Sequence, residues 1–176
     1  SQVRWYEFTT AGTPNVTQSG NINQGQNVWA YFPSIEINAD GDLGLTFMQS
    51  SPTQFVSMIV TGQQFGDQAG VMRVPAQARA GEATYSAVDG SPFRAGNYSS
   101  ISVDPVDDTT FWAANEFATS AATNNWGTFL SHFRVIDPTA PAPVQEGRLF
   151  FVAGSGEVGV NRLYTLDVSA TNRSAF

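Results

Sequence analysis

The residues best suited to chemistry are two carboxylates and a tyrosine in the second half of the chain: Tyr98, Asp104 and Glu116. A glycosidase uses two carboxylates across a pocket, or a tyrosine nucleophile with a glutamate. The spacing of these three residues does not show that they converge. Glu116 is equally typical of a polar residue at a strand end, bonded to a turn backbone. We therefore assign no catalytic residue.

Two acidic turns carry hard oxygen ligands at the short spacing that calcium sites use. These residues are Asn38, Asp40 and Asp42 in the first turn and Asp104, Asp107 and Asp108 in the second. The EF-hand pattern is not met, because Gly44 falls one place late and no glutamate occupies the twelfth position. Asp, Asn and Gly also build tight turns. We favour turns without metal, assign no metal ligand and no cofactor, and keep calcium as the alternative.

His132 is the only histidine, and the chain has no cysteine. This excludes disulfides, thiolate catalysis, iron–sulfur clusters and metal sites built from several histidines. A Ser-His-Asp triad would need partners from distant strands. No Gly-x-Ser-x-Gly elbow leads into a helix, and Gly154-Ser-Gly156 is interpreted as a loop. We predict that His132 lies on the surface of a strand.

The four tryptophans offer flat apolar faces that could stack on sugars, although such residues more often fill the core between sheets. They are Trp5, Trp29, Trp112 and Trp126. Phe111 and Trp112 are neighbours in a predicted strand, so their side chains must point to opposite faces. We predict that Phe111 belongs to the core and leave the role of Trp112 open.

Charge is scarce and mainly acidic. Eight basic residues, all of them arginine, stand against 15 acidic ones, which gives a formal charge of −7 with 13% charged residues among 176. Scattered arginines do not make the basic patch that nucleic acid requires. Without lysine there is no P-loop and no Schiff base. No apolar run approaches the length of a transmembrane helix, so we predict no membrane span.

Neutral polar residues replace charge in this chain. Ser, Thr, Asn and Gln make up 54 of the 176 residues. Such side chains suit solvent faces and turns of β-structure, and the composition is common in secreted and cell-surface β-proteins. We therefore predict an extracellular, cell-surface or periplasmic location.

Short apolar segments recur along the chain, separated by Gly, Pro, Asn and Asp. The predicted strands cover 3–8, 34–38, 43–47, 55–60, 101–103, 109–117, 129–135, 149–152 and 163–168. No stretch carries the i, i+3, i+4 stripe of a long helix. The predicted fold class is all-β, built from antiparallel sheets.

One supersecondary unit occurs twice. Residues 34–45 align without gaps on residues 100–111, an offset of 66, with Asp42 opposite Asp108. Repeats of this kind suggest propeller-type blades, while two similar hairpins in a β-sandwich are the alternative. A propeller needs at least about four blades to close, so the chain would hold a partial propeller, within a longer one or completed by a partner. Residues 3–8 look like the last strand of a preceding blade.

The expected organisation has three parts. Residues 1–136 form the propeller-type blades, and residues 137–145 form a Pro-rich linker. Residues 146–176 form a further β-segment that could begin another domain. The linker is assigned because closely spaced prolines make a chain stiff and extended.

The run 96–117 resembles a signature of sialidase-like (BNR-type) propellers in large secreted bacterial proteins. It reads Gly-Asn-Tyr-Ser-Ser-Ile-Ser-Val-Asp-Pro-Val-Asp-Asp-Thr-Thr-Phe-Trp-Ala-Ala-Asn-Glu-Phe. In that family the pattern is approximately G-D-Y-S-S-M-S-V-D-P-x-D-D-C-T-F-W-Y-T-N-E-Y. Segments 3–8, 33–42 and 61–67 fit the same family in the same order, so the resemblance covers about residues 3–135.

Departures from the family pattern limit what this resemblance implies about activity. Relatives tend to have arginine before the strand at 33–38, within the strand at 55–62, and just after the Thr-Gly pair. In those places this chain has Asn27 or Val28, Met58 or Val60, and Gln63, and Asn97 replaces an aspartate. A sialidase clamps its substrate carboxylate with several arginines. The resemblance therefore implies propeller architecture without sialidase activity.

These observations favour a non-catalytic, extracytoplasmic propeller module that offers a surface for protein docking, scaffolding, or glycan and matrix binding. Two alternatives stay open. One is a fragment of a secreted glycan-processing (sialidase-like) hydrolase, and the other is an accessory subunit of a large extracytoplasmic assembly. The expected partners are the remainder of a longer chain, a neighbouring protein subunit, or a glycan, but not nucleic acid.

Overall fold

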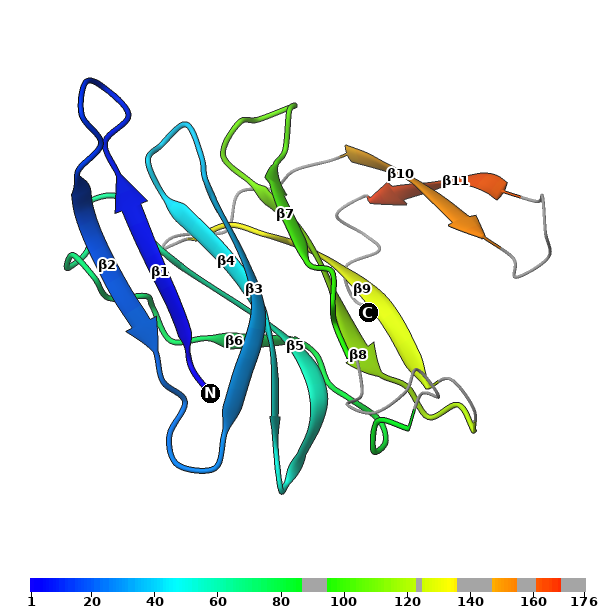
Figure 1. The fold of residues 1–176 in the computed structure, drawn as a ribbon. Coiled ribbons are helices and arrows are strands. Elements are labelled where there is room, and N and C mark those ends of the chain that lie inside the picture. Colours follow the sequence, from blue (N-terminus) through cyan, green and yellow to red (C-terminus); the bar gives the residue numbers. More distant parts are fainter. Residues whose placement is uncertain (87–94, 123–124, 136–146, 155–160, 169–176) are drawn as a thin grey trace. The chain divides into compact units, whose positions relative to one another are not determined.

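The computed structural model describes residues 1–86, 95–122 and 125–135, together with the backbone of two strands at 147–154 and 161–168. These described residues form antiparallel sheets and contain no helix, which confirms the all-β prediction (Figure 1). The chain divides into two compact units, Ser1–Ile136 and Asp137–Phe176. The linker predicted at 137–145 lies outside the described residues.

The first unit contains three sheets that follow one another along the chain. Sheet A is the hairpin of β1 (Val3–Phe8) and β2 (Val16–Ile22). Sheet B is the meander of β3 (Trp29–Ile37), β4 (Leu43–Ser51), β5 (Gln54–Gln63) and β6 (Ala76–Arg79). Sheet C contains β7 (Ser100–Val103), β8 (Phe111–Ala118) and β9 (Trp126–Phe133). Within each sheet, neighbouring strands are consecutive in sequence and antiparallel.

The second unit is described by one hairpin, formed by β10 (Gly147–Gly154) and β11 (Asn161–Val168). The two strands pair in a continuous antiparallel register, from Gly147 opposite Val168 to Gly154 opposite Asn161. Strands were predicted at 149–152 and 163–168, so both are confirmed and both extend further than the apolar residues alone suggested.

Sheet B lies between sheets A and C. Its apolar side chains pack against sheet A on one face and against sheet C on the other. The cluster that it forms with sheet A includes Val3, Trp5, Ile22, Leu43, Leu45, Phe47 and Ile59. The cluster that it forms with sheet C includes Met58, Val60, Ile101, Ala113, Phe129 and Phe133. The prediction that segment 55–60 is covered on both faces is confirmed for most of its length, since every residue from Val56 to Gln63 is buried.

Two strands, β2 and β6, were not predicted, and the place of segment 3–8 in its sheet was predicted wrongly. β2 has polar residues at most positions, and β6 has only four residues, so neither carries a clear apolar pattern. Segment 3–8 was expected to close a preceding sheet. Instead it pairs with β2, because loop 9–15 folds back and the Thr9 amide donates to the Asn15 carbonyl at 2.8 Å.

Sheets B and C can be compared strand by strand if Ile35 is set equivalent to Ile101, as in the sequence alignment. Ile35 in β3 pairs with Leu45 in β4, and Ile101 in β7 pairs with Ala113 in β8. Equivalent residues of sheets B and C are therefore 66 positions apart in the sequence in the first strand and 68 positions apart in the second. It is 70 in the third, because Thr46 pairs with Val60 and Ala114 pairs with Leu130.

The gap-free alignment is therefore wrong beyond the first strand. Each acidic turn is closed by a backbone bond, from Asn38 N to the Asp42 carbonyl at 3.0 Å and from Asp104 N to the Thr110 carbonyl at 2.7 Å. The second turn is two residues longer. Asp42 consequently corresponds to Thr110, and not to Asp108 as the sequence alignment had it.

Candidate functional site

A row of side chains crosses the outer face of sheet C, the face that points away from sheet B. Backbone pairing places Trp112 of β8 between Ser102 of β7 and His132 of β9. The Trp112 and His132 rings stack, with centroids 4.2 Å apart. Trp112 Nε1 donates to Asp104 Oδ2 at 2.9 Å, and His132 Nε2 lies 3.6 Å from the same oxygen. Asp104 thus orients an aromatic pair on this face.

This row does not have the geometry of a hydrolase triad. A triad needs a serine hydroxyl within hydrogen-bond reach of the histidine, and here the Trp112 side chain separates Ser102 from His132. The surface position predicted for His132 is confirmed, because its side chain is about one-third exposed. The loop at Gly154-Ser-Gly156 lies mostly outside the described residues.

The three residues weighed as glycosidase groups do not converge. Tyr98 is 90% exposed. Asp104 bonds through its backbone to Thr110, just before β8, whereas Glu116 lies six residues further along the chain, a span of about 20 Å at the usual rise of a strand. Paired glycosidase carboxylates lie roughly 5 to 9.5 Å apart. This arrangement does not support a catalytic pair of Asp104 and Glu116.

Glu116 interacts electrostatically with a different tyrosine, Tyr31, which sequence reasoning missed. Glu116 Oε2 accepts a hydrogen bond from the Gly96 amide at 2.7 Å. Burial raises the pKa of the Tyr31 phenol above its ordinary value of 10.0, the Ser50 hydrogen bond lowers it, and the Glu116 carboxylate raises it. Tyr31 Oη donates to Ser50 Oγ at 2.9 Å. The Glu116 carboxylate is thus near enough to Tyr31 to act on it electrostatically, and we call these two residues the Tyr31–Glu116 pair; no spacing in the sequence signalled it.

The backbone next to Tyr31 is strained. Phe32 has a φ of 50°, a left-handed conformation that bulky residues rarely adopt. It sits at the irregularity of β3 between Tyr31 and Ser34, and its carbonyl accepts from Asn115 Nδ2 at 3.4 Å. Strain of this kind persists only where the surroundings enforce it, and it gathers at functional sites. It therefore marks the same region as the Tyr31–Glu116 pair.

The polar side chains of the acidic turns form hydrogen bonds with backbone groups. Asn38 Oδ1 accepts from the Asp42 amide at 2.8 Å, and Asn38 Nδ2 donates to the Thr109 carbonyl at 2.7 Å, which ties the two turns together. In the second turn, Asp107 Oδ1 accepts from two amides, at 2.8 and 2.9 Å. Within the described residues, no group of three Asp, Glu or His side chains is placed to hold a metal ion. Calcium stays an untested alternative.

The tryptophans divide between core and surface. Trp5 is buried between sheets A and B, while Trp29 and Trp126 are exposed. The prediction for Phe111 is confirmed, since its side chain is fully buried, and Trp112 lies on the opposite face at intermediate exposure. Among the four tryptophans, Trp126 is therefore the most exposed, and its ring is the most open flat apolar surface on which a sugar could stack.

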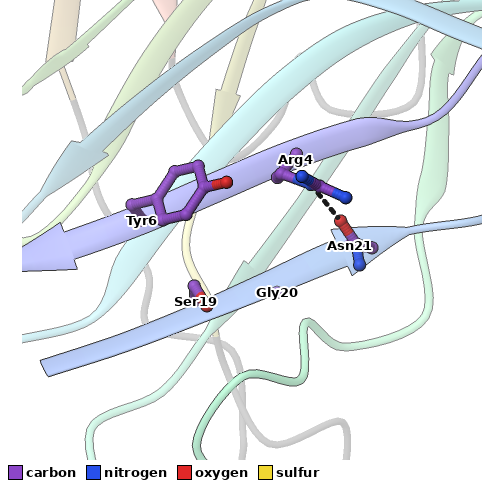
Figure 2. A pocket seen from close by; sticks show the side chains of 5 residues that line it. All are labelled: Arg4, Tyr6, Ser19, Gly20 and Asn21. Carbon is purple, nitrogen blue, oxygen red and sulfur yellow. Dashed lines mark hydrogen bonds between the residues drawn. The ribbon is translucent and has the colours of Figure 1, made fainter. Parts of the chain in front are cut away.

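Two shallow hollows border sheet A. Figure 2 shows the first, a polar hollow of about 230 Å³ lined by Arg4 and Tyr6 of β1 and by Ser19, Gly20 and Asn21 of β2. Arg4 Nε donates to Asn21 Oδ1 at 3.1 Å. The second, of about 250 Å³, runs between β1 and β3 and is largely apolar. Neither hollow is lined by a carboxylate, so neither holds an acid–base pair.

The arginines of the described first unit form hydrogen bonds or ion pairs with different partners. Arg73 bonds Asp67, Arg79 bonds Glu82, Arg4 bonds Asn21, and Arg134 bonds Thr109 and lies 3.9 Å from Asp40. Several arginines converging on one point are needed to clamp a substrate carboxylate. Among the residues that the structure describes in this unit, each arginine is instead bonded to its own local partner.

Comparison with known proteins adds no assignment. No protein-family model, curated protein or solved structure matches the chain. Within the described part of the chain, no helix has the length and apolar character needed to cross a bilayer.

Proposed function

We propose that residues 1–136 form a non-catalytic, propeller-type module of an extracytoplasmic protein and that the module presents a docking surface. The single observation that carries this proposal is that two antiparallel meanders, sheets B and C, pack face to face. Stacked antiparallel meanders of this kind are the building units of propellers. The resemblance of 96–117 to sialidase-like propellers supports the same architecture.

Several features support a role in binding rather than turnover. The carboxylates Asp104 and Glu116 are engaged with Trp112 and Gly96 respectively, and they stand too far apart to act on one glycosidic bond. The exposed Trp126 and the apolar hollow beside β3 suit contact with protein or glycan. The scarcity of charge and the abundance of Ser, Thr, Asn and Gln support an extracytoplasmic location for such a surface.

One observation favours a second candidate, a fragment of a glycan-processing hydrolase. The Tyr31–Glu116 pair lies beside the strained Phe32, and a tyrosine with a glutamate is one known glycosidase pair. The Tyr31 phenol donates to Ser50, and its pKa is raised, so this chain holds the group in its neutral form rather than as an activated nucleophile. We therefore rank this candidate below the docking function.

The decisive experiment is a turnover assay of the full-length protein on sialosides and aryl glycosides. We expect no turnover above the buffer blank, for the wild type and for Glu116→Gln. Glu36→Gln is the matched control, because it makes the same chemical change on β3 at a half-exposed position away from Tyr31 and Phe32. Turnover that is lost in Glu116→Gln and kept in Glu36→Gln would overturn the docking proposal in favour of the hydrolase.

A further inference from the structure

The segment of residues 80–86 crosses from sheet B to the end of the hairpin formed by β8 and β9. It follows β6, forms no strand of its own, and has only exposed and half-exposed residues. The Gly81 amide donates to Ser57 Oγ at 2.9 Å, and a Cβ on Gly81 would lie 2.4 Å from the Val56 carbonyl oxygen. The segment therefore begins in close contact with β5.

The first link from this segment to the hairpin is a carboxylate. Glu82 Oε1 forms an ion pair with Arg79 Nη2, and Glu82 Oε2 accepts a hydrogen bond from the Ser120 amide at 3.0 Å. The Glu82 amide donates to the Ala118 carbonyl at 2.7 Å. The hydrogen bonds with Ser120 hold the pKa of the Glu82 carboxyl below its ordinary value of 4.5, so the group is ionised at neutral pH.

The same ion pair holds a cation over two aromatic rings of sheet C. Arg79 is the last residue of β6, and its Cζ lies 4.7 Å from the centroid of the Phe117 ring and 6.0 Å from that of Phe129. A guanidinium over an aromatic face is attracted by the charge distribution of the ring. Glu82 therefore binds the turn of sheet C and also fixes where the Arg79 charge lies.

The second link is a buried amide. Asn125 is 1% exposed and directly precedes Trp126, the first residue of β9. Its Oδ1 accepts from the Ser86 amide at 2.6 Å and from Ser86 Oγ at 3.2 Å. Its Nδ2 donates to the Thr84 carbonyl at 2.6 Å and to the Thr119 carbonyl at 3.2 Å. A side-chain amide can form four such bonds; here all four are formed, and three of them hold the segment.

Both links hold the same turn, the one between β8 and β9. Glu82 binds this turn at Ala118 and Ser120, and Asn125 closes it, because the Thr119 amide donates to the Asn125 carbonyl at 2.9 Å. Loosening one link therefore frees groups that the other link binds. The two links are expected to form and break together.

We propose that residues 79–86 form a latch that positions Trp126 and that opens while sheets B and C stay folded. This proposal rests on the docking function only in taking Trp126, which is 53% exposed, as part of the docking surface. Glu82 and Asn125 are positioning residues, since they act on that surface through the start of β9. The closed latch holds Trp126 in one place, and the open latch releases it.

The latch opens locally because polar contacts hold it. Segments that bury few apolar side chains open at a lower free energy than the core. Within residues 80–86 only Tyr85 has a large apolar side chain, and it is partly buried against a cluster that includes Met48 and Ala118. Among the described residues, the apolar cluster between sheets B and C contains none from this segment, so that cluster stays packed when the latch opens.

The first test is amide hydrogen exchange in the full 176-residue chain, measured by NMR at several low urea concentrations. In the wild type, the Ser86 and Ser120 amides should exchange faster than the paired amides of β4 and β5. Their rates should also depend less on urea, because opening the latch exposes little surface. Equal rates with equal urea dependence would mean that the latch opens only when the sheets unfold, which overturns the proposal.

Two variants test whether the links act together, and each is read at the amide that the other link holds. Asn125→Ala should speed exchange of the Ser120 amide about tenfold or more, because four hydrogen bonds are lost. Glu82→Gln offers one acceptor where two are used, and it should speed exchange of the Ser86 amide about threefold. A Ser86 amide unaffected by Glu82→Gln, or a Ser120 amide unaffected by Asn125→Ala, overturns the latch.

Matched controls make the same chemical changes outside the latch. Asn115→Ala removes an equally buried amide from β8, and Glu36→Gln neutralises a half-exposed carboxylate on β3. Both positions stay folded when the latch opens, so both variants should leave the exchange of the Ser86 and Ser120 amides unchanged. Acceleration as large as in the latch variants would assign the effect to general loss of stability and overturn the proposal.

The second test follows the side chain that the latch positions. The Trp126 indole N–H signal is identified as the one lost in Trp126→Phe. Its NMR order parameter should fall in Glu82→Gln and in Asn125→Ala, while that of Trp29, which is 43% exposed on β3, should stay the same. A role in stability alone would leave the Trp126 order parameter unchanged, and that result overturns the positioning role.

Failure of the latch and failure of the docking function give different results. Exchange and order parameters at wild-type values in both latch variants would overturn the latch and leave the docking function standing. Glycosidase turnover that is lost in Glu116→Gln would overturn the docking function, whatever the exchange rates of the Ser86 and Ser120 amides.

Discussion

Sheets B and C have the same strand order and corresponding registers, yet they differ in how completely they are covered. Sheet B has four strands and a neighbour on each face, so most residues of β4 and β5 are buried. Sheet C has three described strands, and its β9 contains no buried residue. The comparison teaches that register and burial are set separately. Register follows from the hairpins within a sheet, while burial depends on what lies beside and above it.

The largest effect is expected when the large side chain at the equivalent place in each sheet is removed. Leu43 and Phe111 correspond, both are buried, and each points toward the preceding sheet. Leu43→Ala should lower the free energy of unfolding by about 2–5 kcal/mol and Phe111→Ala by about 3–5 kcal/mol, since each leaves a cavity. Chemical denaturation followed by circular dichroism measures both.

Phe55→Ala provides the control for this pair, because Phe55 lies in sheet B but is 45% exposed. It should change the free energy of unfolding by less than about 1 kcal/mol. If Phe111→Ala were as mild as Phe55→Ala, sheet C would not pack on sheet B in solution, and the equivalence would fail.

A smaller effect is expected at Gly44, where β4 lies against the Phe111 ring of sheet C. A Cβ on Gly44 of β4 would lie 2.7 Å from the Phe111 ring. Gly44→Ala should therefore overpack the contact and lower the free energy of unfolding by about 1–3 kcal/mol. In the Phe111→Ala background the same change should be nearly neutral, because the ring that it would strike is gone. An equal loss in both backgrounds would mean that the ring does not lie against Gly44.

The smallest expected effect concerns Tyr31, where β3 meets the end of β8. Burial raises the pKa of the Tyr31 phenol in the folded chain above its ordinary value of 10.0, with Glu116 adding to the effect. The unfolded chain therefore loses this proton first, so stability is fully present below about pH 10 and falls as pH rises further. Tyr31→Phe should flatten this alkaline decline, as measured by denaturation at several pH values between 8 and 11.

Tyr6→Phe serves as the control, because Tyr6 is exposed on sheet A. It should leave the alkaline decline unchanged. A decline of the same slope in wild type and Tyr31→Phe would contradict the burial of the Tyr31 phenol between sheets B and C.

Much of the fold could be predicted from alternating apolar residues and turn signals. Strands such as β1 and β8 carry aromatic and apolar residues on one face, and a side chain such as Phe111 follows directly from that pattern. β2 and β6 could not be predicted, because they are stabilised by the neighbours with which they pair rather than by their own apolar content. The register of the second sheet was misjudged because two extra residues in turn 104–110 leave no mark in composition.

The candidate site was predicted less well than the fold. Asp104 and His132 were named separately, and their shared contact with Trp112 appears only when three strands are placed in register. The Tyr31–Glu116 pair joins residues 85 positions apart in sequence and depends on how one sheet packs on another. The strain at Phe32 has no sequence signature, because it arises from the irregular pairing of β3 with β4.

The longer turn of sheet C offers a place to lengthen the chain on purpose. Asp104 and Asp107 anchor the two sides of this turn, while Val106 between them is 90% exposed. Loops of this kind accept added residues with little loss of stability. An epitope or fluorophore-bearing peptide grafted beside Val106 would therefore report on the module while leaving its hairpins intact.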